Sequence, residues 1–244
     1  MIYSQFATFY DQLFDNQLYL KWAQYVQKYV PTGANILDLA CGTGRLLVLL
    51  QRAGYQMTGA DLSEEMLTLA SQHASEAHLT LPLLQVNMLD LSGLDQFDAV
   101  TCFDDSLCYL ANLAEVQRVF QAVFQHLVSG GHFCFDVITP YQTDVKYPGY
   151  MYNYQDEKQA FMWTTYAGKV AHSVEHDLTF FLYQADLDAY QAYSETHHER
   201  TYELADYQQA LQAAGFTDVN VSAEFGTAEP TAQTTRWFFH GVKA

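Results

Sequence analysis

The strongest constraint on the fold is the run ILDLACGTG from Ile36 to Gly44, in which an apolar segment ends in a turn of small residues. Apolar residues at helical spacing follow, up to about Arg52. A strand that enters such a turn and leaves as a helix presents free backbone N–H groups to a ligand, because the first turn of a helix lacks partners for them. Asp61 ends the next apolar run, where a carboxylate can accept hydrogen bonds from ribose hydroxyls. These residues predict a nucleoside site.

Apolar runs and amphipathic segments alternate along most of the chain. Predicted strands cover 35–39, 56–60, 83–86, 97–103, 132–138, 219–221 and 236–242, and predicted helices cover 18–30, 44–52, 63–74, 113–126 and 207–214. The pair Gly130-Gly131 marks a break before the fifth strand. Repeated units of strand and helix predict an α/β fold, with a doubly wound, mostly parallel sheet of seven strands and helices on both faces.

The region 148–202 departs from this alternation. Polar residues alternate there with apolar or aromatic ones over 161–166, 170–184 and 189–202, a pattern typical of antiparallel strands. The chain is therefore predicted to form one domain from 1–147 plus 203–244, with an inserted antiparallel β subdomain at 148–202. An insertion after the fifth strand emerges at the carboxyl edge of the sheet, where open α/β sheets bind ligands, so it is expected to cover the substrate pocket.

The chain is strongly acidic, with 28 Asp and Glu residues against 11 Lys and Arg residues and a formal net charge of −17. A field of this sign repels nucleic acids and anionic lipid surfaces, so neither is expected as a partner. No stretch approaches the roughly 18 apolar residues of a membrane span, and the N-terminus lacks the pattern of a signal peptide. The cysteines show no C-x-x-C spacing. We therefore expect a cytoplasmic protein.

Two nucleotide-binding motifs are incomplete in this turn. The Gly-Lys-Ser or Gly-Lys-Thr of a P-loop is absent, which argues against a nucleotide triphosphatase. Leu47 stands where the third glycine of G-x-G-x-x-G would be, which disfavours close packing against a dinucleotide. An NAD(P)-dependent oxidoreductase nevertheless remains an alternative, because its fold begins in the same way.

Together these residues resemble the class I S-adenosylmethionine-dependent methyltransferases that act on small molecules. The run from Asp38 to Gly44 resembles the first motif of the family, and Asp61 matches the acid that holds both ribose hydroxyls. Asn87-Met88 resembles the pair that meets the adenine ring. The segment 97–109 resembles the motif at the fourth strand, and 6–11 resembles the N-terminal segment that covers the cofactor. The resemblance covers nearly the whole chain except the insertion.

The resemblance implies S-adenosylmethionine as the cofactor and a small molecule as the methyl acceptor. The residues that it implies for cofactor binding are Tyr10, Asp38, Ala40, Cys41, Gly42, Gly44, Asp61, Leu62, Met66, Asn87, Met88, Phe103 and Asp104. Two of them depart from the usual pattern: Ala40 stands where the family often has glycine, and Asn87 where aspartate is common. The amide oxygen of Asn87 can still accept a hydrogen bond from the adenine amino group.

Methyl transfer from a sulfonium requires an enzyme mainly to position two partners and exclude water. An amine or phenol acceptor also needs a group that takes its proton. The candidates are Asp105, Tyr109 and Asp136, which lie at or just beyond predicted strand ends. A protein that binds the cofactor without catalysis is the remaining alternative.

Other polar and aromatic residues have structural explanations. His172 and His176 are four apart on a predicted strand rather than a helix, and no metal site is expected. In His197-His198 only one ring can face a pocket, because neighbouring residues of a strand point to opposite faces. The aromatic residues of the insertion are expected to pack between layers rather than to line a pocket.

Overall fold

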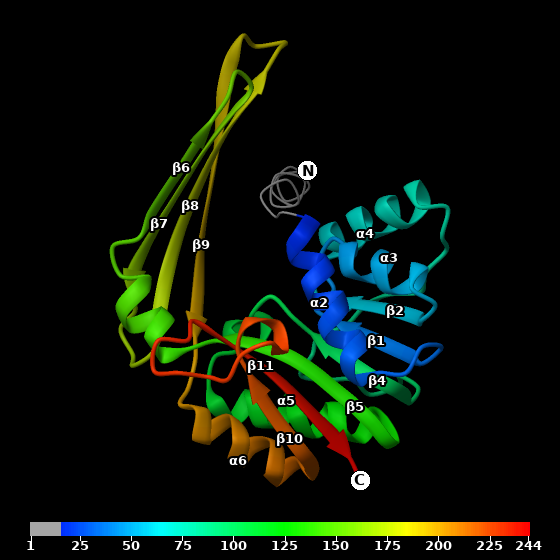
Figure 1. Cartoon of the computed structure of the whole chain (residues 1–244). Helices are drawn as coiled ribbons and strands as arrows, with labels where there is room; N and C mark the ends of the chain where they lie inside the picture. Colours follow the sequence, from blue (N-terminus) through cyan, green and yellow to red (C-terminus); the bar gives the residue numbers. More distant parts are fainter. Residues whose placement is uncertain (1–15) are drawn as a thin grey trace.

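The computed structural model describes residues 16–244, and a large sheet forms its body. The strands of this sheet are β1 (Asn35–Leu39), β2 (Gln56–Asp61), β3 (Leu83–Gln85), β4 (Phe97–Cys102), β5 (Leu127–Ile138), β10 (Phe216–Ser222) and β11 (Arg236–Lys243). Their order within the described residues is β10-β11-β5-β4-β1-β2-β3. Strand β11 runs antiparallel to both of its neighbours, and the other pairs are parallel. The predicted seven-stranded, mostly parallel sheet is confirmed (Figure 1).

Helices cover both faces of this sheet. They are α2 (Asn16–Tyr29), α3 (Arg45–Arg52), α4 (Glu64–Glu76), α5 (Leu113–His126) and α6 (Leu204–Ala214). Figure 1 shows α2, α3 and α4 on one side and α5 and α6 on the other. Buried side chains of α2 and α3 belong to one apolar cluster, and those of α5 and α6 belong to a second. Within residues 16–244, no helix has the length and apolarity needed to cross a membrane.

Local sequence signals set several helix ends. The side chain of Ser63 accepts a hydrogen bond from the backbone N–H of Met66 at the start of α4, as an N-cap does. Asn112 caps α5 in the same way, through the N–H of Glu115. Helix α6 ends at Gly215, whose φ of 107° suits a residue without a side chain. Ser63 thus caps the start of α4, and Gly215 caps the end of α6.

The predicted break at Gly130-Gly131 is wrong, because β5 begins at Leu127 and runs through both glycines. Its register against β4 shifts there, from the pair Phe97 and Leu127 to the pair Ala99 and His132. Gly130 has a φ of +77°, and a Cβ on Gly131 would lie 2.9 Å from a backbone oxygen. The glycines therefore allow an irregularity inside the strand rather than ending it.

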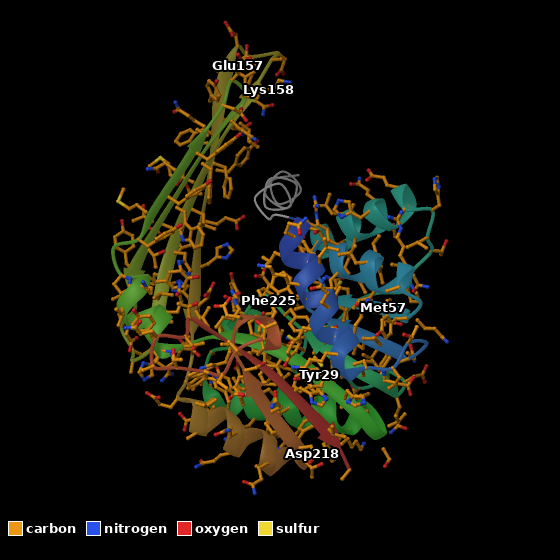
Figure 2. The ribbon with its side chains drawn as sticks, viewed as in Figure 1. Tyr29, Met57, Glu157, Lys158, Asp218 and Phe225 are labelled. Carbon is orange, nitrogen blue, oxygen red and sulfur yellow. The ribbon has the colours of Figure 1, made fainter. Side chains whose placement is uncertain are left out.

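The region after β5 forms a second, antiparallel sheet, which we call sheet B. Its strands, in spatial order, are β6 (Met151–Gln155), β7 (Gln159–Ala167), β8 (Ser173–Gln184) and β9 (Ala189–Arg200). The antiparallel insertion is thus confirmed, although β6 was not predicted. Sheet B rises from the body as a long arm (Figure 1), and Figure 2 shows Glu157 and Lys158 at its tip, far from Met57 and Phe225 in the body. The domain boundaries at 147/148 and 202/203 stay a prediction.

Candidate active site

The turn after β1 holds three residues in the left-handed region of backbone conformation. Ala40, Gly42 and Gly44 have φ values of 58°, 54° and 74°. A Cβ on Gly44 would lie 2.8 Å from the Cβ of Ala70, so a glycine is needed for α3 and α4 to pack closely. A Cβ on Gly42 would meet no atom within 4 Å. Gly42 therefore faces open space, where a ligand can approach the backbone.

The carboxylate of Asp61 joins the end of β2 to this turn. One oxygen accepts a hydrogen bond of 2.8 Å from the backbone N–H of Gly42, and the other accepts one of 2.9 Å from that of Ser63. Burial raises the pKa of Asp61, and these two N–H groups oppose that shift. Each carboxylate oxygen keeps a further lone pair for the hydroxyls of a ribose.

Asp38 lies beneath the turn rather than at its surface. Its side chain is only 3% exposed, and Oδ1 accepts a hydrogen bond of 2.6 Å from the hydroxyl of Thr101. Burial raises the pKa of Asp38 to about 7. Burial and the nearby Asp38 and Asp61 carboxylates also raise the pKa of the Cys41 thiol well above its ordinary value. This environment disfavours the thiolate form of Cys41.

Four of the predicted cofactor-binding residues follow the ends of β2 and β3 along the chain. Leu62 is exposed, and the partly buried Met88 packs against the apolar cluster that includes α5 and α6. Met66, at the start of α4, packs instead against an apolar cluster of sheet B. The exposed Asn87 turns its side-chain oxygen to the backbone N–H of Leu89, at 2.9 Å.

Two other residues predicted to bind the cofactor, Phe103 and Asp104, follow β4 and lie in different environments. Phe103 is 5% exposed, and its ring stacks on that of Trp22 with centroids 6.1 Å apart, so it packs in the body. Asp104 lines the cavity described below. Tyr10 lies outside the described residues, and its predicted role is not tested.

A glycine at position 40 is expected to stabilise the protein. A left-handed backbone conformation costs alanine about 1–2 kcal/mol, a cost that glycine does not have. Glycine in turn loses more chain entropy on folding, which cancels roughly 0.5–1 kcal/mol of this gain. Ala40→Gly should therefore raise the unfolding free energy by about 0.5–1 kcal/mol in urea titrations. Ala60→Gly, at a buried strand position with ordinary backbone angles, should instead lower it. A less stable Ala40→Gly variant would contradict this prediction.

The loop after β4 contains two consecutive aspartates with a strained backbone. Asp104 and Asp105 have φ values of 57° and 47°, which non-glycine residues adopt at a cost. The backbone N–H of Asp105 donates to Asp136 at 2.8 Å, and its carboxylate pairs with Arg236 at 2.8 Å. Burial raises the pKa of Asp105, and Arg236 opposes that rise. These contacts stabilise the strained loop at the carboxyl edge of the sheet.

Asp136, on β5, connects this loop to the body. It is fully buried and accepts hydrogen bonds from Trp22 at 2.7 Å, from Arg236 at 3.0 Å and from the N–H of Asp105. Its oxygens are thus occupied by donors from three parts of the fold. This environment suits a residue that positions the loop, and Asp136 does not line the cavity.

A cavity of about 390 Å³ separates this loop from the inner face of sheet B. It is lined by Asp104, Asp105, Tyr109, Tyr147, Tyr150, Tyr152, Phe161, Trp163, His176, Leu178, Phe180, His197, Glu199 and Arg236. Aromatic residues of the insertion were expected only to pack between layers, and for Tyr152, Phe161, Trp163 and Phe180 that expectation is wrong. They face a cavity because the pleat of β6, β7 and β8 places them on the same side of sheet B.

Tyr109 closes the polar end of this cavity. Its hydroxyl lies 3.0 Å from Nδ1 of His197, whose Nε2 lies 3.0 Å from the carboxylate of Glu195. Desolvation of the hydroxyl and the nearby Glu199 carboxylate raise the pKa of Tyr109, although the residue as a whole is half exposed. His197 faces the cavity while His198 approaches Glu175 on the outer face, which confirms that only one of the two histidines faces a pocket.

Sequence reasoning missed five polar or aromatic residues of the cavity. These are Tyr147, Tyr150, His176, Glu199 and Arg236. For two of them a signal existed: β8 and β9 pair with His176 opposite His197, and Glu199 follows on the same face. Only the register of that hairpin brings them together. Arg236 gave no such signal, because its partners lie far away in the sequence.

A seven-stranded sheet of this order, with a glycine turn after β1 and an acid at the end of β2, defines a nucleoside-binding α/β protein. A model of the methyltransferase domain matches residues 36–131. A protein of Geobacillus sp. (strain WCH70) that is named as a methyltransferase is 39% identical over 248 residues. The alignment covers 100% of both chains. The chain belongs to the class I S-adenosylmethionine-dependent methyltransferases, and S-adenosylmethionine is its cofactor.

A solved structure has the same fold over almost the whole length of this chain. An S-adenosylmethionine-dependent methyltransferase from Clostridium acetobutylicum ATCC 824 superposes with a TM-score of 0.86, at 25% identity and with 99% of each chain covered. The membership excludes the alternative of an NAD(P)-dependent oxidoreductase.

Two further relatives differ in the atom that their names say is methylated. A dTDP-3-amino-3,6-dideoxy-alpha-D-glucopyranose N,N-dimethyltransferase of Streptomyces fradiae is 27% identical, covering 86% of this chain and 79% of its own length. A ubiquinone biosynthesis O-methyltransferase of Alkalilimnicola ehrlichii is 32% identical over 108 residues, covering 43% of this chain and 42% of its own length.

Proposed function

We propose that the protein transfers a methyl group from S-adenosylmethionine to a small molecule bound in the cavity beneath sheet B. The observation that carries this proposal is the cavity itself. Its volume of about 390 Å³ suits a small organic molecule, and its wall is largely aromatic with a few convergent polar groups. Relatives named for amino-sugar and ubiquinone substrates support an acceptor of this size. The net charge of −17 disfavours a nucleic-acid substrate.

The turn after β1 fits the cofactor. The open space at Gly42 lets a nucleoside approach the backbone, and the carboxylate of Asp61 would accept from the ribose hydroxyls. Met88 and Asn87 would meet the adenine ring, and Asp104 lies on the side of the cavity where the acceptor would bind. The bound cofactor supplies an electrophilic methyl group on a sulfonium.

The chain contributes mainly position and exclusion of water. The inner face of sheet B closes the cavity with aromatic side chains, which exclude water from the reacting atoms. Arg236 and Asp136 hold the strained loop of Asp104 and Asp105 in one conformation, so that the acceptor meets a rigid wall. Of the three predicted catalytic candidates, Asp105 and Tyr109 line the cavity, and we propose a positioning role for Asp136.

Binding and transfer can be measured separately. We expect calorimetry to show S-adenosylmethionine binding to the purified chain, and labelled S-adenosylmethionine to label small molecules in a metabolite extract of Geobacillus cells. The control is heat-inactivated protein. No binding by folded protein that retained no cofactor during purification would contradict cofactor use by this chain. Tight binding with label found only in macromolecules, or transferred to nothing, would contradict the proposed acceptor class and favour a module that binds without catalysis.

A further inference from the structure

The polar end of the cavity contains a buried carboxylate, Glu199, with one oxygen that makes no hydrogen bond within the described part of the chain. Oε2 of Glu199 has no hydrogen bond to any described residue, and neither has Nε2 of His176, which lies 3.6 Å away. The two residues are only 7% and 2% exposed, and both line the cavity. Native proteins satisfy nearly all of their buried polar atoms. Two such atoms left together at a cavity wall therefore point to a ligand.

The contacts of His176 determine its charge. The indole nitrogen of Trp163 lies 3.0 Å from Nδ1 of His176, and an indole N–H can only donate. Nδ1 must therefore accept, which leaves the ring neutral with its proton on Nε2. The hydroxyl of Thr165 lies 2.7 Å from the same Nδ1 atom. A neutral His176 can orient Glu199 but cannot balance its negative charge.

No other side chain of the cavity wall supplies the missing positive charge. Of the described residues that line the cavity, only Arg236 is permanently cationic, and it is bonded to Asp105 and Asp136. Arg200 follows Glu199 on β9, so it points to the opposite face of sheet B. A buried carboxylate without a counter-ion is costly, and a cationic ligand removes that cost.

Aromatic rings adjoin His176, the neighbour of this carboxylate, and line the same cavity. The ring of Tyr147 meets that of His176 edge to face, with centroids 4.9 Å apart, and the ring of Trp163 lies 5.4 Å from His176 and 5.3 Å from Tyr150. Aromatic faces attract organic cations, most strongly where water is excluded. A cavity wall that combines a carboxylate with aromatic rings is a suitable environment for a protonated amine and a poor one for a neutral alcohol.

We propose that the methyl acceptor carries an amine and that Glu199 binds its ammonium group, with His176 orienting the carboxylate. The proposal rests on the proposed function, because it assumes that the acceptor occupies this cavity. It selects amines over hydroxyl acceptors. Glu199 is thus a residue that determines specificity.

The test compares amines with alcohols of the same shape. The probes are benzylamine against benzyl alcohol and tyramine against tyrosol, titrated by calorimetry into the protein saturated with S-adenosylhomocysteine at neutral pH. Wild-type protein should bind each amine at least about tenfold more tightly than its alcohol, the effect of a charged hydrogen bond. In Glu199→Gln this preference should fall below roughly threefold, while Glu199→Asp, which keeps the charge, should retain part of it.

Glu175→Gln is the matched control, because Glu175 lies on the outer face of sheet B and its loss changes the net charge equally. This variant should keep the wild-type preference. Equal affinities for amines and alcohols in the wild type would overturn the proposal, and so would amines that fail to bind at tens of millimolar. Either result leaves the proposed function intact if label is still transferred to small molecules. Unchanged affinity for S-adenosylhomocysteine in Glu199→Gln shows that the variant has folded.

Discussion

Replacing Arg236 by methionine is expected to lower the unfolding free energy by about 3 kcal/mol, because it leaves buried carboxylates without their cation. Arg236 lies 2.8 Å from the carboxylate of Asp105 and 3.0 Å from that of Asp136, and both acids are buried. Methionine fills a similar volume, so the loss of stability would come from the missing charge and not from a cavity. Urea titration followed by tryptophan fluorescence measures the effect.

The loss in Arg236→Met should also depend on pH in a definite direction. Burial raises the pKa of Asp105, and Arg236 opposes that rise. Without Arg236 the pKa of Asp105 rises further, so the variant takes up a proton at higher pH. The stability difference from wild type should therefore shrink as the pH falls from about 8 towards about 5. Arg118→Met, at an exposed position of α5, is the control and should change stability by less than about 0.5 kcal/mol. A similarly small loss in Arg236→Met would contradict the prediction.

Asp61→Ala should weaken S-adenosylmethionine binding by about 1.5–3 kcal/mol, the range for a hydrogen bond to a charged group. This corresponds to roughly a 10- to 150-fold rise in the dissociation constant measured by calorimetry. The substitution removes the expected acceptor of the ribose hydroxyls, and it also frees the N–H of Gly42, which Asp61 holds at 2.8 Å. Both effects act on the same binding step.

The matched control for this change is Asp95→Ala, at an exposed position after β3, which should leave the affinity unchanged. Asp61→Asn separates the two effects further, because it keeps one acceptor oxygen for Gly42 or Ser63 while it loses the charge. It should bind more tightly than Asp61→Ala and less tightly than wild type. Wild-type affinity in Asp61→Ala would place the ribose elsewhere.

The sheet and the turn could be predicted because their signals are local. Apolar periodicity identifies a strand or helix without knowledge of its partners, and the caps at Ser63 and Gly215 act within one helical turn. The same locality explains the error at Gly130 and Gly131. Two glycines usually interrupt a strand, and only the shift in register between β4 and β5 shows that they continue it.

The polar residues of the cavity beneath sheet B could not be predicted in the same way. Glu199 and His176 become neighbours through the register of β8 and β9, and Arg236 reaches Asp105 from a strand at the far end of the chain. Asp136 illustrates the same limit, because its place at a strand end suggests a catalytic acid. Its bond to Trp22, from a helix that precedes the whole sheet, supports a positioning role instead.

Sheet B leaves and rejoins the body at almost one point. The hydroxyl of Thr201, just after β9, donates to the backbone oxygen of Ile138 at the end of β5, at 2.6 Å. A segment anchored in this way can be exchanged as a unit, because its replacement changes neither the turn after β1 nor the order of the strands. On the proposed function, we expect that grafting the corresponding segment of a relative between Ile138 and Thr201 exchanges one acceptor preference for another.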